Sequence, residues 1–288
     1  MRSAIIILLT LLAATSHGQQ RQSTATPGKK PFVLGLVDEL PSKLLSEKRT
    51  LNIYLPEGYN DNDTTTYPVV YVLDGSADED FIHISGLYQF NSFPWVNRVS
   101  KSIVVGIANV DRKRDFTFPT TIKADKDKYP TTGQSGKFIA FLQQELQPYI
   151  RQNYRTNGVK TIIGESLGGL LATEILLKKP SLFDHYIIVS PSLWWDNGSL
   201  LKANTELSAP GGMAKKMVYI GVGKEGLTPG NSPRVMEVDA NLLAEKLTTL
   251  KNPSLKVYLD YLPLENHGTI MHQAVFNALK LFAPKAEE

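Results

Sequence analysis

The chain has 288 residues, of which 20% are charged, and 31 basic against 28 acidic side chains give a formal net charge of +3. Its basic residues are scattered, and the one tight cluster, at positions 112–114, is bracketed by aspartates, so it indicates an ion-paired loop and gives no support for nucleic-acid binding. The chain contains no cysteine, which excludes disulfides, thiolate metal sites and a cysteine nucleophile.

The first residues have the pattern of a secretion signal. Arg2 precedes an apolar run over residues 4–14, which is too short to cross a bilayer as a helix of about 20 residues. Ser16 and Gly18 are the small residues expected three positions and one position before a cut after Gly18. We therefore expect residues 1–18 to be a cleaved signal peptide that directs the protein to the periplasm or the exterior, with no membrane span afterwards; an uncleaved N-terminal anchor is the alternative.

After a polar stretch over residues 19–30, expected to be a flexible leader, short apolar runs alternate with helical patterns. The apolar or alternating runs predict strands at 51–55, 69–73, 103–107, 159–163, 186–189, 217–220 and 257–262. Apolar residues at helical spacing predict helices at 81–90, 138–154, 170–177, 238–250 and 270–282. Strands separated by helices imply right-handed crossovers, so residues 31–288 are predicted to form a single α/β domain, with a mainly parallel sheet and helices on both faces.

One long segment, residues 111–136, is polar and weakly patterned. It is either a plain surface loop or an excursion over a functional site. We favour the excursion, because loops at the carboxyl edge of an open parallel sheet carry function.

A sharp-turn motif stands between a predicted strand and a predicted helix. Residues 164–169 read Gly-Glu-Ser-Leu-Gly-Gly, which contains Gly-x-Ser-x-Gly, the nucleophile elbow of α/β-hydrolases. A serine at this turn needs strained backbone angles, and its neighbours must lack side chains that would collide with the crossing strand and helix. The start of the helix also places backbone N–H groups beside the hydroxyl. The motif predicts an α/β-hydrolase fold with Ser166 as the nucleophile.

The serine needs a base within hydrogen-bond reach, and histidine usually supplies it. Of the five histidines, His17 leaves with the signal and His185 opens a predicted strand. His83 and His272 lie inside predicted helices. His267 lies in a polar loop after the last strand, where this fold carries its catalytic histidine, so it is the predicted base.

The acid that orients the histidine should follow the strand at 217–220. Glu225 is the first carboxylate there, and glycines flank it. A solvated turn residue paired with Lys224 is the other interpretation of Glu225. Glu237, Asp239 or a Ser–His pair without any acid are the alternatives for the site.

Two backbone N–H groups are needed to hold the oxyanion. We expect one from Leu167, directly after the nucleophile, and the other from Ser76 in the loop after the strand at 69–73, with Gly75 as second choice. Trp194 and Trp195 follow the strand at 186–189 and are either a substrate wall, for an aromatic, sugar or acyl group, or core anchors. No His, Asp or Glu cluster has metal-ligand spacing, so neither a metal nor a cofactor is expected.

With these residues in place, the chain resembles the esterase D-like family of α/β-hydrolases, and within it the enterochelin-esterase branch of periplasmic siderophore hydrolases. The resemblance extends from about residue 51 to the C-terminus and is carried by residues 70–75, 114–117, 164–169, 190–195 and 266–268. It implies Ser166 as nucleophile and His267 as base. Relatives with the Leu-Asp-Gly turn use the N–H just after that glycine in the oxyanion hole, which favours Ser76. The acid varies: some members have Asp or Glu at the position matching Glu225, while the siderophore branch is described as working with a Ser–His pair.

These observations lead to the hypothesis of an exported serine esterase that works through an acyl-enzyme on Ser166 without a cofactor. Siderophore esters are the leading substrate class. Feruloyl or acetyl esters of carbohydrates come second. Two further hypotheses are an acyltransferase with the same site and a non-catalytic binding module on the same scaffold. The sequence carries no prediction of oligomeric state.

Overall fold

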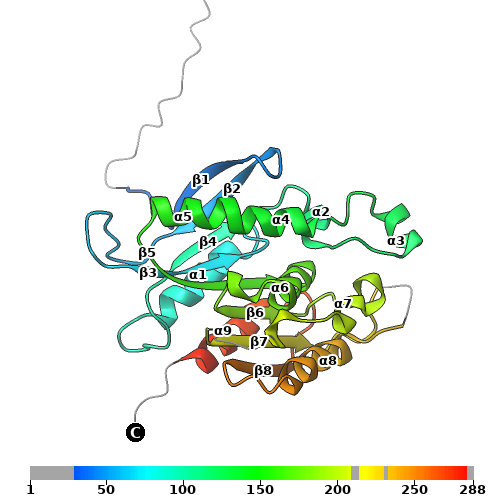
Figure 1. Cartoon of the computed structure of the whole chain (residues 1–288). Helices are drawn as coiled ribbons and strands as arrows, with labels where there is room; N and C mark the ends of the chain where they lie inside the picture. Colours follow the sequence, from blue (N-terminus) through cyan, green and yellow to red (C-terminus); the bar gives the residue numbers. More distant parts are fainter. Residues whose placement is uncertain (1–28, 209–213, 230–232, 284–288) are drawn as a thin grey trace, which may run out of the picture. The chain divides into compact units, whose positions relative to one another are not determined.

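The core of the computed structural model is a sheet, which has eight strands among the residues that the structure describes (Figure 1). The strands are β1 (Leu36–Ser42), β2 (Glu47–Tyr54), β3 (Tyr67–Val72), β4 (Ile103–Ile107), β5 (Thr156–Glu165), β6 (His185–Val189), β7 (Lys216–Gly223) and β8 (Leu255–Leu262). Their order is β1-β2-β4-β3-β5-β6-β7-β8; β2 pairs antiparallel with β1 and β4, and every other neighbouring pair is parallel. This mainly parallel sheet confirms the predicted α/β-hydrolase fold.

The structure describes residues 29–208, 214–229 and 233–283. The predicted signal peptide, its cut after Gly18 and the leader up to residue 28 lie outside the described residues. The described residues before Gly35 belong to a separate unit from those that follow, and the fold concerns the latter.

All seven predicted strands are present as β2 to β8, each with ends shifted by a few residues at most. The first strand, β1, was not predicted. It is an edge strand that is mostly exposed and contains Pro41, so it lacks the continuous apolar signal of a covered strand. By contrast, every residue of β4 is buried, as expected for a parallel strand with both faces covered.

The helices are α1 (Phe81–Asn91), α2 (Arg112–Phe116), α3 (Lys123–Lys128), α4 (Ser135–Phe141), α5 (Gln147–Asn153), α6 (Leu167–Lys178), α7 (Ser199–Lys202), α8 (Met236–Thr249) and α9 (Ile270–Phe282). On β6, Tyr186 and Ile188 share one hydrophobic cluster with residues of α4, α6 and α8. Their neighbours Ile187 and Val189 are equally buried, and side chains alternate between the faces of a strand. Helices α1 and α9 pack against each other, and α9 contacts β6, β7 and β8. The predicted covering of both faces is therefore confirmed.

The predicted helix over 138–154 is helical up to Asn153, but it is not one regular α-helix. A π-helical turn, η1 (Leu142–Leu146), separates α4 from α5. Pro148 stands in the first turn of α5. A proline inside a helix has no N–H to donate and its ring collides with the carbonyl four residues earlier, so the wider turn accommodates it.

The weakly patterned segment 111–136 contains two short helices, α2 and α3, which extend to one side of the sheet in Figure 1. Neither helix was predicted, because five or six residues are too few to show a helical period. Within the part of the chain that the structure describes, no helix has the length and apolar character needed to cross a membrane.

Candidate active site

Ser166 lies at the turn between β5 and α6 in a strained backbone conformation, with φ of 57° and ψ of −117°. Such a conformation costs about 1–3 kcal/mol and persists only when the surroundings hold it. Three backbone hydrogen bonds do so: the Ser166 N–H donates to the carbonyl of Val189 (3.0 Å), and the Ser166 carbonyl accepts from the N–H groups of Leu170 and Ser192 (2.9 Å each). The elbow is thus locked between β6 and α6.

The glycines of the elbow do not all have the same role. A Cβ at Gly164 would lie 2.5 Å from the carbonyl oxygen of Gly168, and one at Gly169 would lie 2.9 Å from the Cα of Pro191. A Cβ at Gly168 would meet its nearest neighbours at 3.4 Å, which the structure could absorb with a small shift. The strict requirement for glycine therefore falls on Gly164, which the motif includes, and on Gly169, which lies one residue after the second glycine of the motif.

His267 lies in the loop between β8 and α9, and its Nδ1 is 2.6 Å from Oε2 of Glu225. Glu225 follows β7, and its side chain is 4% exposed against 48% for that of His267. The other carboxylate oxygen of Glu225 accepts hydrogen bonds from the Ser190 hydroxyl and from the Gly223 N–H (3.2 Å). The structure thus brings two of the predicted site residues together and adds Ser190 to them.

These contacts shift both pKa values in the direction that keeps the pair charged. Burial by itself raises the pKa of Glu225, but hydrogen bonds from His267 and Ser190 outweigh it and lower that pKa below its ordinary value. The hydrogen bond to Glu225 raises the pKa of His267 against the opposing effect of burial. An imidazolium formed at His267 is therefore stabilised by its neighbour.

The other two carboxylates considered for the site have different partners. Glu237, in the first turn of α8, accepts hydrogen bonds from the N–H groups of Glu225 (2.9 Å) and Gly226 (3.0 Å), so it holds the loop that carries Glu225. Asp239 accepts from Nε of Arg234 at 2.9 Å. Of the three, Glu225 is the carboxylate whose hydrogen bond reaches His267.

Two pockets meet at Ser166. The first, of about 240 Å³, is lined by Ser166, Ser192, Trp194, Glu225, Leu227, Pro229, Met236 and His267. The second, of about 190 Å³, is lined by Arg112, Lys113, Thr117, Tyr129, Thr132, Ser166, Leu167, Ser192, Trp194, Trp195 and Pro229. Ser166 and His267 therefore face a common cavity. The Ser166 hydroxyl makes its hydrogen bond with the buried Ser192 hydroxyl at 3.2 Å, a partner that sequence reasoning did not find.

The two tryptophans lie differently. Trp194 is half-buried and lines both pockets. Trp195 is 2% exposed and donates from its indole Nε1 to the carbonyl of Phe118 at 2.8 Å. Trp195 thus anchors the core and also borders the second pocket, whereas Trp194 contributes to the walls of both pockets.

The predicted oxyanion donors are only partly brought together. Leu167 begins α6 and lines the second pocket. Ser76 is not among the described residues that line either pocket, and its N–H donates to a carboxylate oxygen of Glu79 at 3.4 Å, a long and weak bond. The N–H of Gly75, the second choice, is engaged by the carbonyl of Ile107 at 3.0 Å. Ser76 is therefore the more available of the two.

The segment 111–136 is tied to the elbow by Arg112. This guanidinium donates from Nε and Nη2 to the two oxygens of Asp74 (2.6 and 2.8 Å), and from Nη2 to the carbonyl of Glu165 (3.3 Å). The tight basic cluster of the sequence therefore has a definite task. Its tertiary partners could not be read from the sequence, although the aspartates that bracket it indicated pairing.

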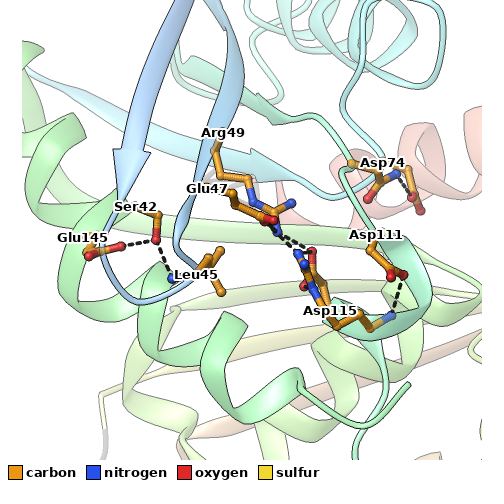
Figure 2. A network of polar contacts seen from close by, with 10 residues as sticks. Ser42, Leu45, Glu47, Arg49, Asp74, Asp111, Asp115 and Glu145 are labelled. Atoms are coloured by element: carbon orange, nitrogen blue, oxygen red, sulfur yellow. Dashed lines mark hydrogen bonds and ion pairs between the residues drawn. The ribbon is translucent and has the colours of Figure 1, made fainter. Parts of the chain in front are cut away.

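A second set of charges fastens α2 to β2. Figure 2 shows the side chains of Arg49, Glu47 and Asp115 pointing toward one another, and Arg49 pairs with both carboxylates. Arg114 completes the network through 2.7 Å contacts to Asp115 and Glu47. Arg49 is fully buried, and its guanidinium also stacks over the ring of Phe138 at 5.2 Å.

The residue before Ser166 is a carboxylic acid with an altered pKa. Burial raises the pKa of Glu165 to about 7; the nearby His267 imidazole opposes this rise, while Asp80 and Asp74 add to it. In turn, Glu165 helps to raise the pKa of His267. The described residues contain no group of three or more His, Cys, Asp or Glu side chains that could ligate one metal ion.

A strained serine at a strand-to-helix turn, on a mainly parallel sheet of this order, defines a hydrolase of the α/β-hydrolase class. The chain belongs to the Putative esterase family, whose model matches residues 42–253. It is therefore a carboxylic-ester hydrolase, and the family predicted from the sequence motifs is confirmed.

Three relatives illustrate the likeness. An IroE-like serine hydrolase from Shewanella oneidensis is 32% identical and superposes with a TM-score of 0.72 over 86% of this chain and 79% of its own. The BES protein from Bacillus cereus is 29% identical, with a TM-score of 0.75 over 90% of this chain and 99% of its own. The ferri-bacillibactin esterase BesA of Bacillus subtilis (strain 168) is 27% identical over 252 residues, which are 82% of this chain and 85% of that protein.

Proposed function

We propose that the protein is an exported serine esterase that hydrolyses siderophore esters through an acyl-enzyme on Ser166. The observation that carries the chemistry is that Ser166 and His267 line one pocket, where Nδ1 of His267 is held 2.6 Å from the Glu225 carboxylate. The siderophore substrate is supported by the relative named as a ferri-bacillibactin esterase, which matches most of this chain.

The geometry supports the following sequence of steps. Glu225 keeps the proton of the neutral imidazole on Nδ1 of His267, so Nε2 is free to accept the proton of Ser166 as its Oγ attacks the ester carbonyl. The tetrahedral oxyanion accepts hydrogen bonds from the N–H of Leu167 and, as the second donor, from that of Ser76. The imidazolium of His267 then gives its proton to the leaving alcohol as the ester C–O bond breaks.

Water then hydrolyses the acyl-enzyme. His267 takes a proton from the water as its oxygen attacks the acyl carbonyl, and His267 returns that proton to the Ser166 oxygen as the acyl–serine bond breaks. Before the first attack, the Ser166 hydroxyl must turn from Ser192 to His267. The bond it gives up is long and worth about 1 kcal/mol, so this rotation is a minor part of the barrier.

The decisive experiment compares Ser166→Ala, His267→Ala and, as a matched control, the exposed Ser181→Ala. Turnover of a 4-nitrophenyl ester and of a ferric catecholate trilactone should fall by at least about 10³-fold in the first two variants and stay unchanged in the control. Mass spectrometry of a quenched reaction should show an acyl adduct on the peptide that contains Ser166. Undiminished turnover in a folded Ser166→Ala variant contradicts the mechanism.

The substrate class is tested with the wild-type enzyme. Comparing kcat/KM for a ferric catecholate lactone, feruloylated arabinoxylan and acetylated xylan should place the lactone first. A preference for either polysaccharide would assign the protein to carbohydrate ester hydrolysis, and acyl transfer to an added alcohol in preference to water would make it an acyltransferase.

Export is proposed from Arg2, the apolar run over residues 4–14 and the small residues at positions 16 and 18. Expression of the full chain in a Gram-negative host should yield a periplasmic protein whose first residue is Gln19. A Gly18→Leu variant should keep its N-terminus and stay with the membrane fraction. Recovery of the wild-type chain in the cytoplasm with residues 1–18 intact contradicts export.

A further inference from the structure

We propose that the two pockets at Ser166 divide the ester between them, and that the acyl half is recognised as an anionic, aromatic group. The alcohol pocket is the one that contains His267, and the acyl pocket is the one that contains Lys113 and Tyr129. The inference rests on the proposed function, because it assigns places to the two parts of a substrate that Ser166 attacks.

The two pockets share the nucleophile but differ in what else they contain. Ser166, Ser192, Trp194 and Pro229 line both, so the reacting carbonyl lies at their junction. The remaining walls come from different elements: α8 and the loops after β7 and β8 on one side, and the segment 111–136 with Leu167 and Trp195 on the other. Groups attached to opposite sides of the carbonyl therefore meet different surfaces.

Proton transfer decides which half goes where. The base that protonates the leaving oxygen must lie next to it, so the alcohol half extends along the side of His267. Leu167, whose N–H faces the oxyanion in the proposed mechanism, lines the other pocket. The acyl chain therefore extends into the pocket beside Leu167.

The acyl pocket is cationic. Its charged lining residues are Arg112 and Lys113, and no Asp or Glu is among the described residues that line it. The two oxygens of Asp74 accept hydrogen bonds from Arg112, so much of the positive charge of Arg112 is neutralised. Lys113 is an exposed residue that lines this pocket, and its Nζ lies 4.4 Å from the centroid of the Tyr129 ring, so it is the cation at the pocket wall.

A second lysine strengthens the field at the same place. The Nζ of Lys128 lies 5.1 Å from the centroid of the Tyr129 ring, so this ring carries a cation from α2 and another from α3. With Trp194 as a further aromatic wall, the pocket offers flat apolar surfaces and positive charge together. An acyl half that combines an aromatic ring with a negative charge matches both.

The test uses esters that carry one carboxylate in different places. In 4-nitrophenyl 4-carboxybenzoate the charge is on the acyl ring, and 4-nitrophenyl 4-methylbenzoate is its neutral partner of similar shape. In 4-carboxyphenyl 4-methylbenzoate the charge is on the alcohol ring, and 4-methylphenyl 4-methylbenzoate is its neutral partner. For each pair, the ratio of kcat/KM for the charged ester to that for the neutral ester is measured, so intrinsic reactivity cancels between enzymes.

Lys113→Gln should lower the acyl-side ratio by about two- to fivefold, as expected for one solvated ion pair, and Lys113→Gln with Lys128→Gln by about tenfold. The alcohol-side ratio should not change. Lys123→Gln is the control, since Lys123 is an exposed α3 residue paired with Asp127 (2.5 Å). In the wild type, 0.5 M NaCl should reduce the acyl-side ratio to near its double-variant value because salt screens exposed charges.

An acyl-side ratio that is the same in wild type and double variant overturns the proposal, and so does a lysine effect that appears in the alcohol-side ratio. Either result is distinct from failure of the proposed function, which would show as turnover that survives Ser166→Ala whatever the two ratios are.

Discussion

Ser190 donates a hydrogen bond to the carboxylate of Glu225 from a position that is itself strained, with φ of 40°. Ser190 is fully buried and follows β6 directly, and its N–H donates to the carbonyl of Gly221 on β7 at 2.8 Å. The oxygen of Glu225 that Ser190 occupies is the one that His267 does not use. Ser190 therefore acts as a positioning residue that fixes the orientation of the carboxylate.

Replacing Ser190 by alanine should lower kcat by about tenfold, since a hydrogen bond to a charged group is worth about 1.5–3 kcal/mol. Without this donor the Glu225 carboxylate stabilises the imidazolium more strongly, so the pKa of His267, and with it the acid limb of the pH profile of kcat/KM, should move upward. A stability loss alone would not move that limb. Ser190→Thr, which keeps the hydroxyl, should restore part of the activity, and equal kcat in wild type and Ser190→Ala would exclude a positioning role.

The pH dependence of activity should follow His267. The base must be neutral to accept a proton, and the hydrogen bond that His267 donates to the Glu225 carboxylate raises the pKa of His267 above the ordinary 6.5. Therefore kcat/KM should rise with pH to a half-maximal point above 6.5. In Glu225→Gln this point should move down, because the negative charge that favours the imidazolium is gone.

Glu225→Gln should also cost roughly 10³–10⁴ in kcat if the acid fixes the tautomer of His267. Steady-state kinetics between pH 5 and pH 9 measure both effects. The exposed Glu57→Gln serves as the control for the loss of one acidic charge. A small loss in Glu225→Gln, far less than that of His267→Ala, would indicate a Ser–His pair that works without the acid.

Glu165 should make the folded state less stable as the pH rises. Its pKa is raised from 4.5 to about 7 by burial, so the folded protein binds this proton more tightly than the unfolded chain does. The contribution is fully favourable below pH 4.5 and is lost as the pH rises through 7, with a total of about 1–3 kcal/mol. Glu165→Gln should remove this loss, so thermal melts should show it gaining stability over wild type between pH 5 and pH 8. A stability difference that does not change with pH would contradict the inference.

Substitutions at the adjacent residues Lys48 and Arg49 should differ sharply in their effect on stability, because Arg49 forms buried ion pairs and Lys48 an exposed one. Arg49→Met leaves Asp115 and Glu47 with the less buried Arg114 as their cation, and we expect a loss of about 3 kcal/mol in the free energy of unfolding, the lower end of the cost of breaking a buried ion pair. Lys48→Met removes an exposed ion pair with Glu39 (2.7 Å), and we expect a change of at most about 1 kcal/mol. Urea unfolding measures both, and equal effects at positions 48 and 49 would refute the role assigned to the network.

The strands and helices that have a clear apolar run or a helical spacing of apolar residues were predictable from the sequence, and the elements without such a pattern were not. The strands β3 to β7 each contain a short apolar run, and the elbow is a local motif, so both the sheet and the place of Ser166 could be inferred. The edge strand β1 and the short helices α2 and α3 have no such period. The roles of Ser190 and Ser192 could not be predicted either, because they depend on which carboxylate or hydroxyl group the fold brings next to each serine.

The candidate acid shows a different limit of the sequence, which offered three carboxylates for one role. Sequence order placed Glu225, Glu237 and Asp239 on the same stretch after β7, and no spacing rule separates them. The fold does: the first reaches His267, the second holds the backbone of the first, and the third pairs with Arg234. Distinguishing them required the tertiary positions of β8 and α8.

In the segment between β4 and α4, the residues that attach it to the rest of the protein are not those of α3. Its beginning is fastened by Arg112, Arg114 and Asp115, whereas α3 contributes no buried residue. Insertions or substitutions at α3 should therefore leave the elbow and the sheet undisturbed while they change the surroundings of Tyr129, which directly follows α3 and lines the second pocket. New ligand preferences could arise there during evolution at little thermodynamic risk, and the same stretch is the natural target for retuning the enzyme in the laboratory.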